Sequence, residues 1–179
     1  MTRFFFAVVP PEPALSVIDA LRARWGHPHQ KVEPHITVKP PFPHEGQPER
    51  FLAPVRAALS GITPLQARLG DPARFGGAVL YLSVLCPGLQ ALHRAVLQAL
   101  EPFAPPDPRF HEGESYTPHL TLAGTRFGVS PGGLDRMERE AEGELSDLNP
   151  FTVSFLRCYR RDEKDGPWQP LCDLPFGGL

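Results

Sequence analysis

The sequence is poor in cysteine. Its 179 residues include three, at Cys86, Cys158 and Cys172, and their spacing matches no zinc-binding motif and leaves an odd number. Reduced thiols are typical of the cytoplasm, where we expect the chain to act. Long hydrophobic runs are missing too, because the apolar residues 4–9 are too few for a membrane-spanning helix or a signal peptide. We therefore expect no metal site and no membrane partner.

An excess of positive charge is also absent. Lys and Arg number 18 against 20 Asp and Glu, so the formal net charge is −2. This balance argues against a protein that coats nucleic acids through a generally basic surface, although it leaves room for a local basic groove. No glycine-rich phosphate loop is expected, because Gly76-Gly77 lacks the lysine and the strand-loop-helix context of that motif. We expect no cofactor.

A short motif does occur twice. Residues 34–38 are Pro-His-Ile-Thr-Val, and residues 118–122 repeat the pattern as Pro-His-Leu-Thr-Leu, 84 positions later. Val, Ile, Leu and Thr favour strands, in which side chains two positions apart point to the same face. Each copy therefore places an imidazole beside a hydroxyl and directs the aliphatic residue between them into a core. Two copies facing one cleft would form a site of four groups, which are His35, Thr37, His119 and Thr121.

The motifs lie in a repeated order of predicted elements. Periodicity and breakers in the first half predict strand 4–9, helix 13–25, strand 35–39, helix 51–59 and strand 65–69. The second half predicts strand 78–85, helix 89–100, strand 119–122, helix 131–148 and strand 151–159. The sequence thus predicts one α+β domain, 1–179, built from a duplicated β-α-β-α-β unit with lobes 3–70 and 78–160 and a further strand 168–174.

Several segments are predicted to interrupt these elements. Gly26-His27-Pro28 is expected to end the first helix. Residues 40–43, which include three prolines, are expected to stop the second strand, because proline cannot continue a central strand. Residues 70–77 are expected to form a turn region between the two halves.

The pair of motifs indicates chemistry at phosphorus. One neutral histidine can take a proton from an attacking water or hydroxyl, and a second, protonated histidine can give a proton to the leaving oxygen. Two threonine hydroxyls can hold the non-bridging oxygens of a phosphate. In-line displacement of this kind depends mostly on positioning and charge stabilisation, and it needs neither a nucleophilic side chain nor a metal.

Two His-x-Thr motifs on strands of a duplicated chain of this length resemble those of the 2H phosphoesterase superfamily. Residues 34–42 resemble in particular the bacterial branch called 2′-5′ RNA ligase or RNA 2′,3′-cyclic phosphodiesterase. The resemblance implies two antiparallel sheets lining a cleft in a bilobal fold, with helices outside. It also implies hydrolysis of cyclic phosphate ends of RNA or nucleotides, or reversible 2′-5′ joining of RNA ends. By the match, the two histidines and two threonines take the catalytic positions.

Four further residues are candidates for substrate binding. Lys39 shares a face with Thr37 by the period-two rule and could pair with a phosphate, or it could be a solvated strand end. Phe42 and Tyr116 lie near the motifs and could stack on a base or fill a core. Many family members carry a basic residue soon after the second motif, and the first such residue here is Arg126.

Other charged residues and histidines have a simpler explanation. Arg157, Arg160 and Arg161 near the end of strand 151–159 could border an RNA groove, but surface charge explains them as well. His93 falls within helix 89–100 and is expected at the surface or its boundary.

The leading hypothesis is a metal-independent phosphoesterase acting on 2′,3′-cyclic phosphate ends, working as a monomer. A relative acting on a smaller substrate, such as a cyclic phosphate of ADP-ribose, stays open. The alternative from another class is a module that binds RNA ends or nucleotides without turnover. The two complete motifs argue against it, and a non-enzymatic RNA binder is usually more basic.

Overall fold

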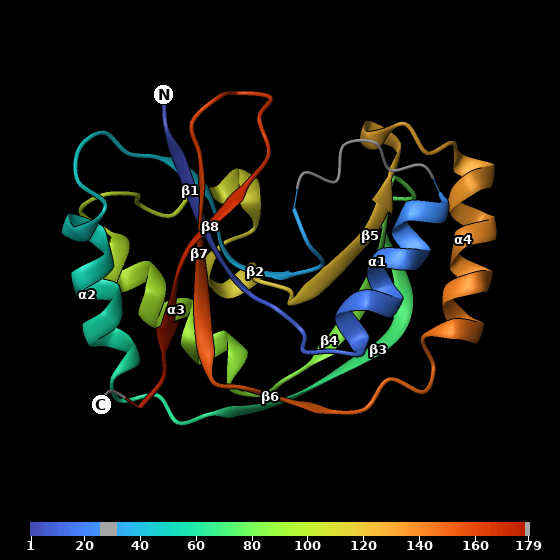
Figure 1. The fold of residues 1–179 in the computed structure, drawn as a ribbon, viewed down its shortest axis with the longest axis horizontal. Coiled ribbons are helices and arrows are strands. Elements are labelled where there is room, and N and C mark those ends of the chain that lie inside the picture. Colours follow the sequence, from blue (N-terminus) through green and yellow to red (C-terminus); the bar gives the residue numbers. More distant parts are fainter. Residues whose placement is uncertain (26–31, 178–179) are drawn as a thin grey trace.

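The computed structural model describes residues 1–25 and 32–177, which form eight strands, four α-helices and three short 3₁₀ helices (Figure 1). The strands are β1 (Arg3–Val8), β2 (Ile36–Pro43), β3 (Leu65–Phe75), β4 (Val79–Leu85), β5 (His119–Gly124), β6 (Phe151–Val153), β7 (Phe155–Arg161) and β8 (Gln169–Pro175). The α-helices are α1 (Ala14–Arg24), α2 (Glu49–Leu59), α3 (Leu89–Leu100) and α4 (Pro131–Glu144). The 3₁₀ helices are η1 (Pro108–Phe110), η2 (Gly113–Ser115) and η3 (Thr125–Phe127). The expected end of the first helix at residues 26–28 lies outside the described residues.

All eight strands belong to one sheet with the order β6-β3-β4-β5-β2-β1-β7-β8, and neighbouring strands are antiparallel. The α+β class is confirmed, but one continuous sheet stands in place of the two sheets that were expected. Its halves, β6-β3-β4-β5 and β2-β1-β7-β8, are joined by a single residue pair, Ile36 with Leu120. The sheet is therefore almost divided where the two motifs meet.

Each half of the sheet contains strands from both sequence repeats. β4 of the second repeat pairs with β3 of the first and with β5 of its own repeat. β1 of the first repeat pairs with β7 of the second and with β2 of its own repeat. The last strand of each predicted repeat, β3 of 3–70 and β7 of 78–160, pairs with the first strand of the other, so the predicted repeats exchange their last strands.

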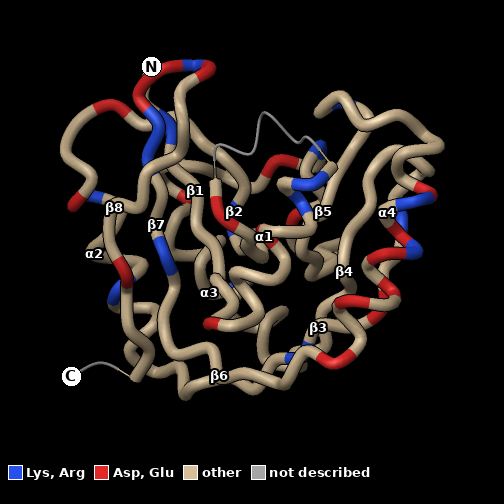
Figure 2. Tube along the Cα trace, turned by 45° about the vertical axis from the view of Figure 1, so that its right-hand side comes forward, with Lys and Arg blue, Asp and Glu red and all other residues tan. Residues whose placement is uncertain are grey.

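The helices lie in two pairs at either side of the molecule (Figure 1). α2 and α3 pack on each other, with α3 against β2 and α2 against β8, whereas α4 contacts β3 and α1 contacts β5. Strand β1 shows how the core forms: Phe4, Phe6 and Val8 enter the main core, and Phe5 and Ala7 face the other way, beside Tyr159. Acidic and basic residues are interspersed in the first part of the outer helix α4, and its last charged residues are acidic (Figure 2).

Strand β2 runs through the prolines that were expected to stop it. Phe42 and Pro43 pair with Phe4 and Arg3 of β1. On its other side, β2 pairs with β5 at Ile36 only. Beyond that residue it is an edge strand, where the missing N–H of proline leaves no partner unsatisfied.

Two other boundaries differ from prediction. The expected turn region 70–77 is mostly strand: β3 continues past a register shift after Leu69, and the tight turn is made by Gly76 and Gly77, which both have positive φ. The predicted strand 151–159 is two strands, β6 and β7, at opposite sides of the sheet. They are separated at Ser154, where no Gly or Pro signals the break.

None of the helices in the described ranges is long and apolar enough to cross a membrane.

Candidate active site

The two His-x-Thr motifs meet at the junction of the two sheet halves. The paired residues, Ile36 and Leu120, are the central residues of the motifs, and both side chains are fully buried in the core. The histidine and threonine on either side of each therefore point to the opposite face. There His35, Thr37, His119 and Thr121 line one cavity of about 430 Å³. Because the two strands are antiparallel and Ile36 pairs with Leu120, His35 lies towards Thr121 and His119 lies towards Thr37.

The two imidazoles are held in the same way. His35 Nδ1 lies 2.8 Å from the carbonyl oxygen of Glu33, and His119 Nδ1 lies 2.7 Å from that of Thr117. A carbonyl oxygen can only accept a hydrogen bond, so Nδ1 carries the hydrogen in both rings. In the neutral state Nε2 is then the unprotonated nitrogen, available as a base, and in the protonated state it becomes a donor.

Each imidazole also lies against a stacked pair of aromatic rings. Phe5 and Tyr159 stack at 4.5 Å between ring centroids, and Phe5 lies 5.1 Å from His35. Phe75 and Tyr81 stack at 4.0 Å, and Phe75 lies 4.9 Å from His119 in an edge-on contact. The two halves of the sheet thus build equivalent surroundings for the two rings.

Burial disfavours the protonated form of both histidines in the free protein. It lowers the pKa of His35 to about 4, against a weaker opposing effect of the hydrogen bond to Glu33. Burial likewise lowers the pKa of His119, with a smaller contribution in the same direction from Arg126. Both rings are therefore neutral at pH 7, and a bound anion would favour protonation of one of them.

The threonine hydroxyls are available to a ligand. Within residues 1–25 and 32–177, neither Thr37 nor Thr121 uses its side-chain oxygen in a hydrogen bond to protein, although the Thr37 carbonyl accepts one from Tyr116 Oη at 2.8 Å. Each hydroxyl can donate to a phosphate oxygen.

Of the four predicted substrate-binding residues, Arg126 lines this cavity. Its guanidinium lies 4.4 Å from the ring centroid of Phe127. Phe42 lies in the core, 5% exposed, against Phe4, Phe6 and Phe51. It fills the core and does not face the cavity.

Lys39 lies on the face opposite the cavity because β2 contains a bulge. Ala7 pairs with Thr37 and Phe6 pairs with Lys39, so Val38 is the extra residue and the alternation of faces breaks there. Lys39 is 3% exposed, and its Nζ lies 2.7 Å from Glu112 Oε1. The expectation that it shares a face with Thr37 is therefore wrong.

A matching bulge follows the second motif. There Tyr81 pairs with Thr121 and Leu80 pairs with Ala123, so Leu122 is the extra residue. Both His-x-Thr motifs thus end in a bulge one residue after the threonine.

Tyr116 lies behind β2 and does not reach the cavity. Its ring stacks on His93 at 3.9 Å between centroids. His93 is fully buried rather than at the surface: Nε2 accepts a hydrogen bond from the Gly113 N–H at 2.9 Å, and Nδ1 donates to the Val38 carbonyl at 2.6 Å. Because these two bonds fix the neutral ring, they explain how a histidine is accommodated in the core. The pair fastens the loop before the second motif to the bulge after the first.

Several cavity residues were missed in the sequence. Arg22 comes from the last turn of α1, Phe110 from η1, and Trp168 from the turn before β8. Arg161, for which the sequence left open the border of an RNA groove or surface charge, lies with its guanidinium 4.4 Å from the ring centroid of Trp168 and also lines the cavity. These residues lie far from the motifs in sequence, and no local pattern marks them.

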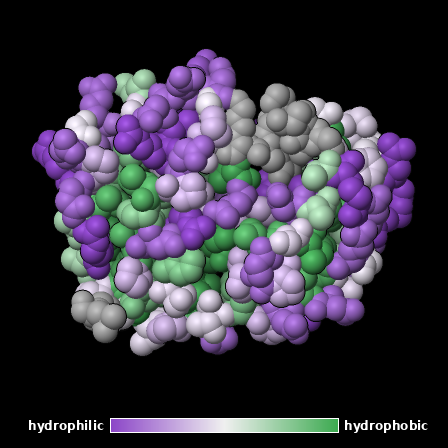
Figure 3. Space-filling view, in the orientation of Figure 1, coloured by the Kyte–Doolittle hydropathy of each residue, from purple (hydrophilic) through white to green (hydrophobic). Residues whose placement is uncertain are grey.

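In the space-filling view, hydrophobic surface is visible in the middle of the molecule, bordered by hydrophilic residues (Figure 3).

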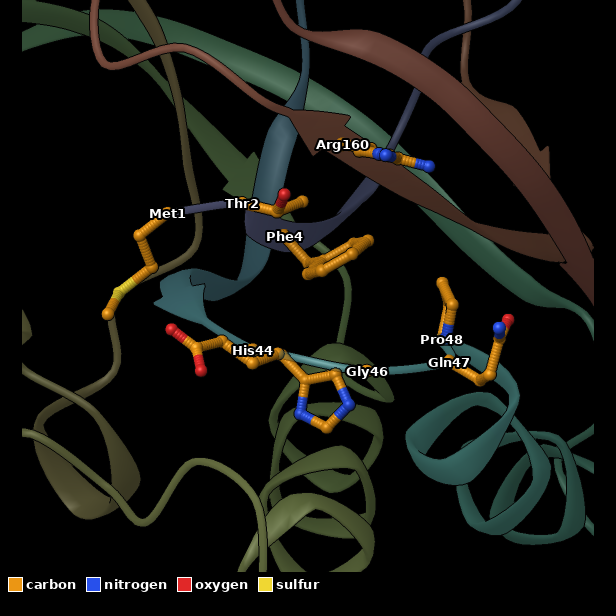
Figure 4. A pocket seen from close by; sticks show the side chains of 9 residues that line it. Met1, Thr2, Phe4, His44, Gly46, Gln47, Pro48 and Arg160 are labelled. Carbon is orange, nitrogen blue, oxygen red and sulfur yellow. The ribbon is translucent and has the colours of Figure 1, made fainter.

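A second cavity, of about 500 Å³, lies beside the start of β1 and the segment that follows β2 (Figure 4). His44 and Arg160 line it, but neither motif does, and Arg160 is engaged with Asp162 at 2.8 Å. In the described parts of the chain, no three His, Cys, Asp or Glu side chains are grouped so that they could hold a metal ion. The paired acid-base groups are therefore found in the first cavity.

A family model described as the 2′-5′ RNA ligase superfamily matches residues 9–165, which include both motifs and every residue of the sheet junction. The chain belongs to the 2′-5′ RNA ligase superfamily. This confirms the resemblance seen in the sequence. A sequence comparison with curated proteins found no match.

Solved structures have a similar fold. TT0787 of Thermus thermophilus has a TM-score of 0.62 at 18% identity, with 98% of each chain covered. Escherichia coli LigT in complex with 3′-AMP has a TM-score of 0.61 at 17% identity, again with 98% of each chain covered. Usb1 of Kluyveromyces marxianus has a TM-score of 0.50 at 14% identity and the same coverage. At these identities the similarity concerns the fold.

Proposed function

We propose that this protein is a phosphoesterase that hydrolyses 2′,3′-cyclic phosphate ends of RNA or of nucleotides, using His35 and His119 as base and acid. The observation that carries the proposal is the pair of equivalent imidazoles, each with Nδ1 bonded to a backbone carbonyl, in one cavity with two threonine hydroxyls. A ligand with a 3′-phosphate is bound by the distant structural relative LigT, as its complex with 3′-AMP indicates.

The step needs two proton transfers and one displacement. Nε2 of the neutral histidine accepts a proton from water as its oxygen attacks phosphorus. The bond between phosphorus and the 2′ or 3′ ribose oxygen breaks, and Nε2 of the protonated histidine gives its proton to that oxygen. The threonine hydroxyls donate to the non-bridging oxygens, where negative charge accumulates. Run backwards with an RNA hydroxyl in place of water, the same groups would join two ends.

His35 is the better candidate for the base. Burial lowers its pKa to about 4, so it stays neutral across the physiological range. Burial also lowers the pKa of His119, but the shift is smaller than that of His35, so His119 is the ring that is protonated more easily. We therefore assign His119 the role of the acid.

Purified protein would be tested with the four nucleoside 2′,3′-cyclic monophosphates in excess EDTA, with products separated by chromatography. His35→Ala and His119→Ala should each lower kcat by at least about 100-fold, because each removes a general acid or base. His111→Asn is the control: that residue is exposed, lies outside the cavity and has φ 53°, which asparagine tolerates. Fully active histidine variants, or turnover that appears only on addition of a metal, would contradict the mechanism.

The assignment of acid and base needs a second substrate. A 4-nitrophenyl phosphodiester has a leaving group that needs no proton. On this substrate, His119→Ala should recover most of its lost rate relative to His35→Ala. Equal losses in both variants would contradict the assigned roles.

If the folded parent protein binds cyclic phosphates but does not turn them over, the non-catalytic alternative is favoured.

A further inference from the structure

The cavity at the two motifs has a cationic wall. Among the described residues that line it are Arg22, Arg126 and Arg161, and no Asp or Glu. This contrasts with the whole chain, in which acidic residues outnumber Lys and Arg by 20 to 18. A concave site lined by charge of one sign attracts a ligand of the opposite sign. The three arginines differ in how much of their hydrogen-bonding capacity the protein itself uses.

Arg22 is the most buried of the three and has two buried donor atoms without a partner in the described part of the chain, against one, Nε, in Arg161. It is 5% exposed, and its Nε and Nη1 atoms are buried without a hydrogen-bond partner in the described part of the chain. Nη2 donates to the Val32 carbonyl at 3.3 Å, and Nη1 lies 3.8 Å from the exposed carboxylate of Asp19. Burial accordingly lowers the pKa of Arg22 to about 10. A buried cation with unfilled donors is costly unless an anion meets it.

Arg24, two residues later on the same helix, differs from Arg22 in the direction of its side chain and in its hydrogen-bond partners. Residues two apart on a helix point in nearly opposite directions. Arg24 points outward and donates to Glu144 at 2.6 Å and to Glu140 at 3.4 Å. Arg22 points inward, where its charge lies close enough to lower the pKa of His35 further. The same helix turn therefore carries one arginine that is satisfied by protein and one that is not.

We propose that Arg22 binds an oxygen of the phosphate held beside His35, and that α1 thereby supplies the cation that is missing directly after the second motif. The residues after that motif are Ala123-Gly124-Thr125, which carry no charge. Nε and Nη1 lie on different edges of the guanidinium, and either can give a charge-assisted hydrogen bond to a phosphate oxygen. The inference rests on the proposed function only in taking the ligand to be a phosphate or phosphate ester.

The test compares Arg22→Met with Arg24→Met, the same substitution on the outer side of the helix. Calorimetric titration with inorganic phosphate measures binding without turnover. Arg22→Met should weaken phosphate binding about 10- to 100-fold, the range expected from loss of charge-assisted hydrogen bonds, and Arg24→Met should leave it within about twofold. The unfolding midpoint of ligand-free Arg22→Met should equal or exceed that of the parent, because an unpaired buried charge is removed.

Unchanged phosphate affinity in Arg22→Met would overturn the inference. A lower unfolding midpoint together with that unchanged affinity would show that Arg22 has a structural role instead. If the methionine variant does not fold, Arg22→Gln takes its place, with the same weakening expected. If the parent protein shows no turnover but its phosphate binding depends on Arg22, the proposed function is refuted and this inference is supported. If the parent turns over cyclic phosphates and Arg22→Met has unchanged KM and phosphate affinity, the proposed function stands and this inference is refuted.

Discussion

The buried ion pair between Lys39 and Glu112 gives a prediction whose size follows from the structure. The side chains are 3% and 2% exposed, and Nζ lies 2.7 Å from Oε1. At that distance and an effective dielectric constant of about 20, the attraction is about 6 kcal/mol, and the loss of hydration of two ions offsets most of it. Removing one partner leaves the other charge buried alone. We expect Lys39→Met and Glu112→Gln each to lower the free energy of unfolding by about 3–5 kcal/mol.

The double variant should be much less destabilised than the sum of the single ones. Removing both charges abolishes the attraction and the hydration cost together, so Lys39→Met/Glu112→Gln should come within about 1–3 kcal/mol of the parent. The remaining deficit reflects Glu112 Oε2, which accepts a hydrogen bond from the Asp107 N–H at 2.6 Å.

Urea unfolding of the four proteins at pH 7 measures this double-mutant cycle. Additive losses in the double variant, or single losses below about 1 kcal/mol, would refute the reasoning. The pair also fastens the loop that carries Phe110 into the cavity, so the single variants should lose activity at urea concentrations that the parent tolerates.

Three further predictions concern the motifs. Because burial lowers the pKa of His35 from 6.5 to about 4, the native state binds fewer protons than the unfolded state between these pH values. The free energy of unfolding should therefore fall by up to about 3 kcal/mol as the pH is lowered from 6.5 to 4. Urea unfolding of the parent and of His35→Gln tests this, and an equal pH dependence in both would contradict it. Thr37→Val and Thr121→Val should each lower kcat/KM about 10- to 100-fold with little change in unfolding midpoint, and undiminished turnover would remove the hydroxyls from the mechanism. Tyr116→Phe leaves the Thr37 carbonyl without its donor and should cost about 1–3 kcal/mol in urea unfolding, whereas a neutral variant would show that water replaces the phenol.

The sequence predicted best what depends on near neighbours. The sharing of a face by His35 and Thr37 follows from the strand period over three residues, and helix 89–100 follows from its regular leucines. The face of Lys39 could not be predicted in this way, because the bulge at Val38 depends on how β1 pairs with β2.

Long-range contacts account for the other differences. Nothing near Arg22 in the sequence shows that its side of α1 meets the cavity, since the residues it approaches, such as Val32 and His35, belong to other segments. The break at Ser154 lacks a turn signal because the chain there passes from one half of the sheet to the other in extended form. Phe42 looked equally suited to a core or a base, and only packing against Phe51 places it in the core.

The exchange of last strands between the repeats has an evolutionary consequence. A half-length ancestor with one β-α-β-α-β unit would have lacked the third strand beside its first two, since here β1 pairs with β7 and β4 pairs with β3. Two such chains could complete each other by swapping that strand, as in a domain-swapped homodimer. Gene duplication and fusion would then have joined the partners covalently, and a cavity formed between two identical subunits would have gained the freedom to give its two histidines different roles.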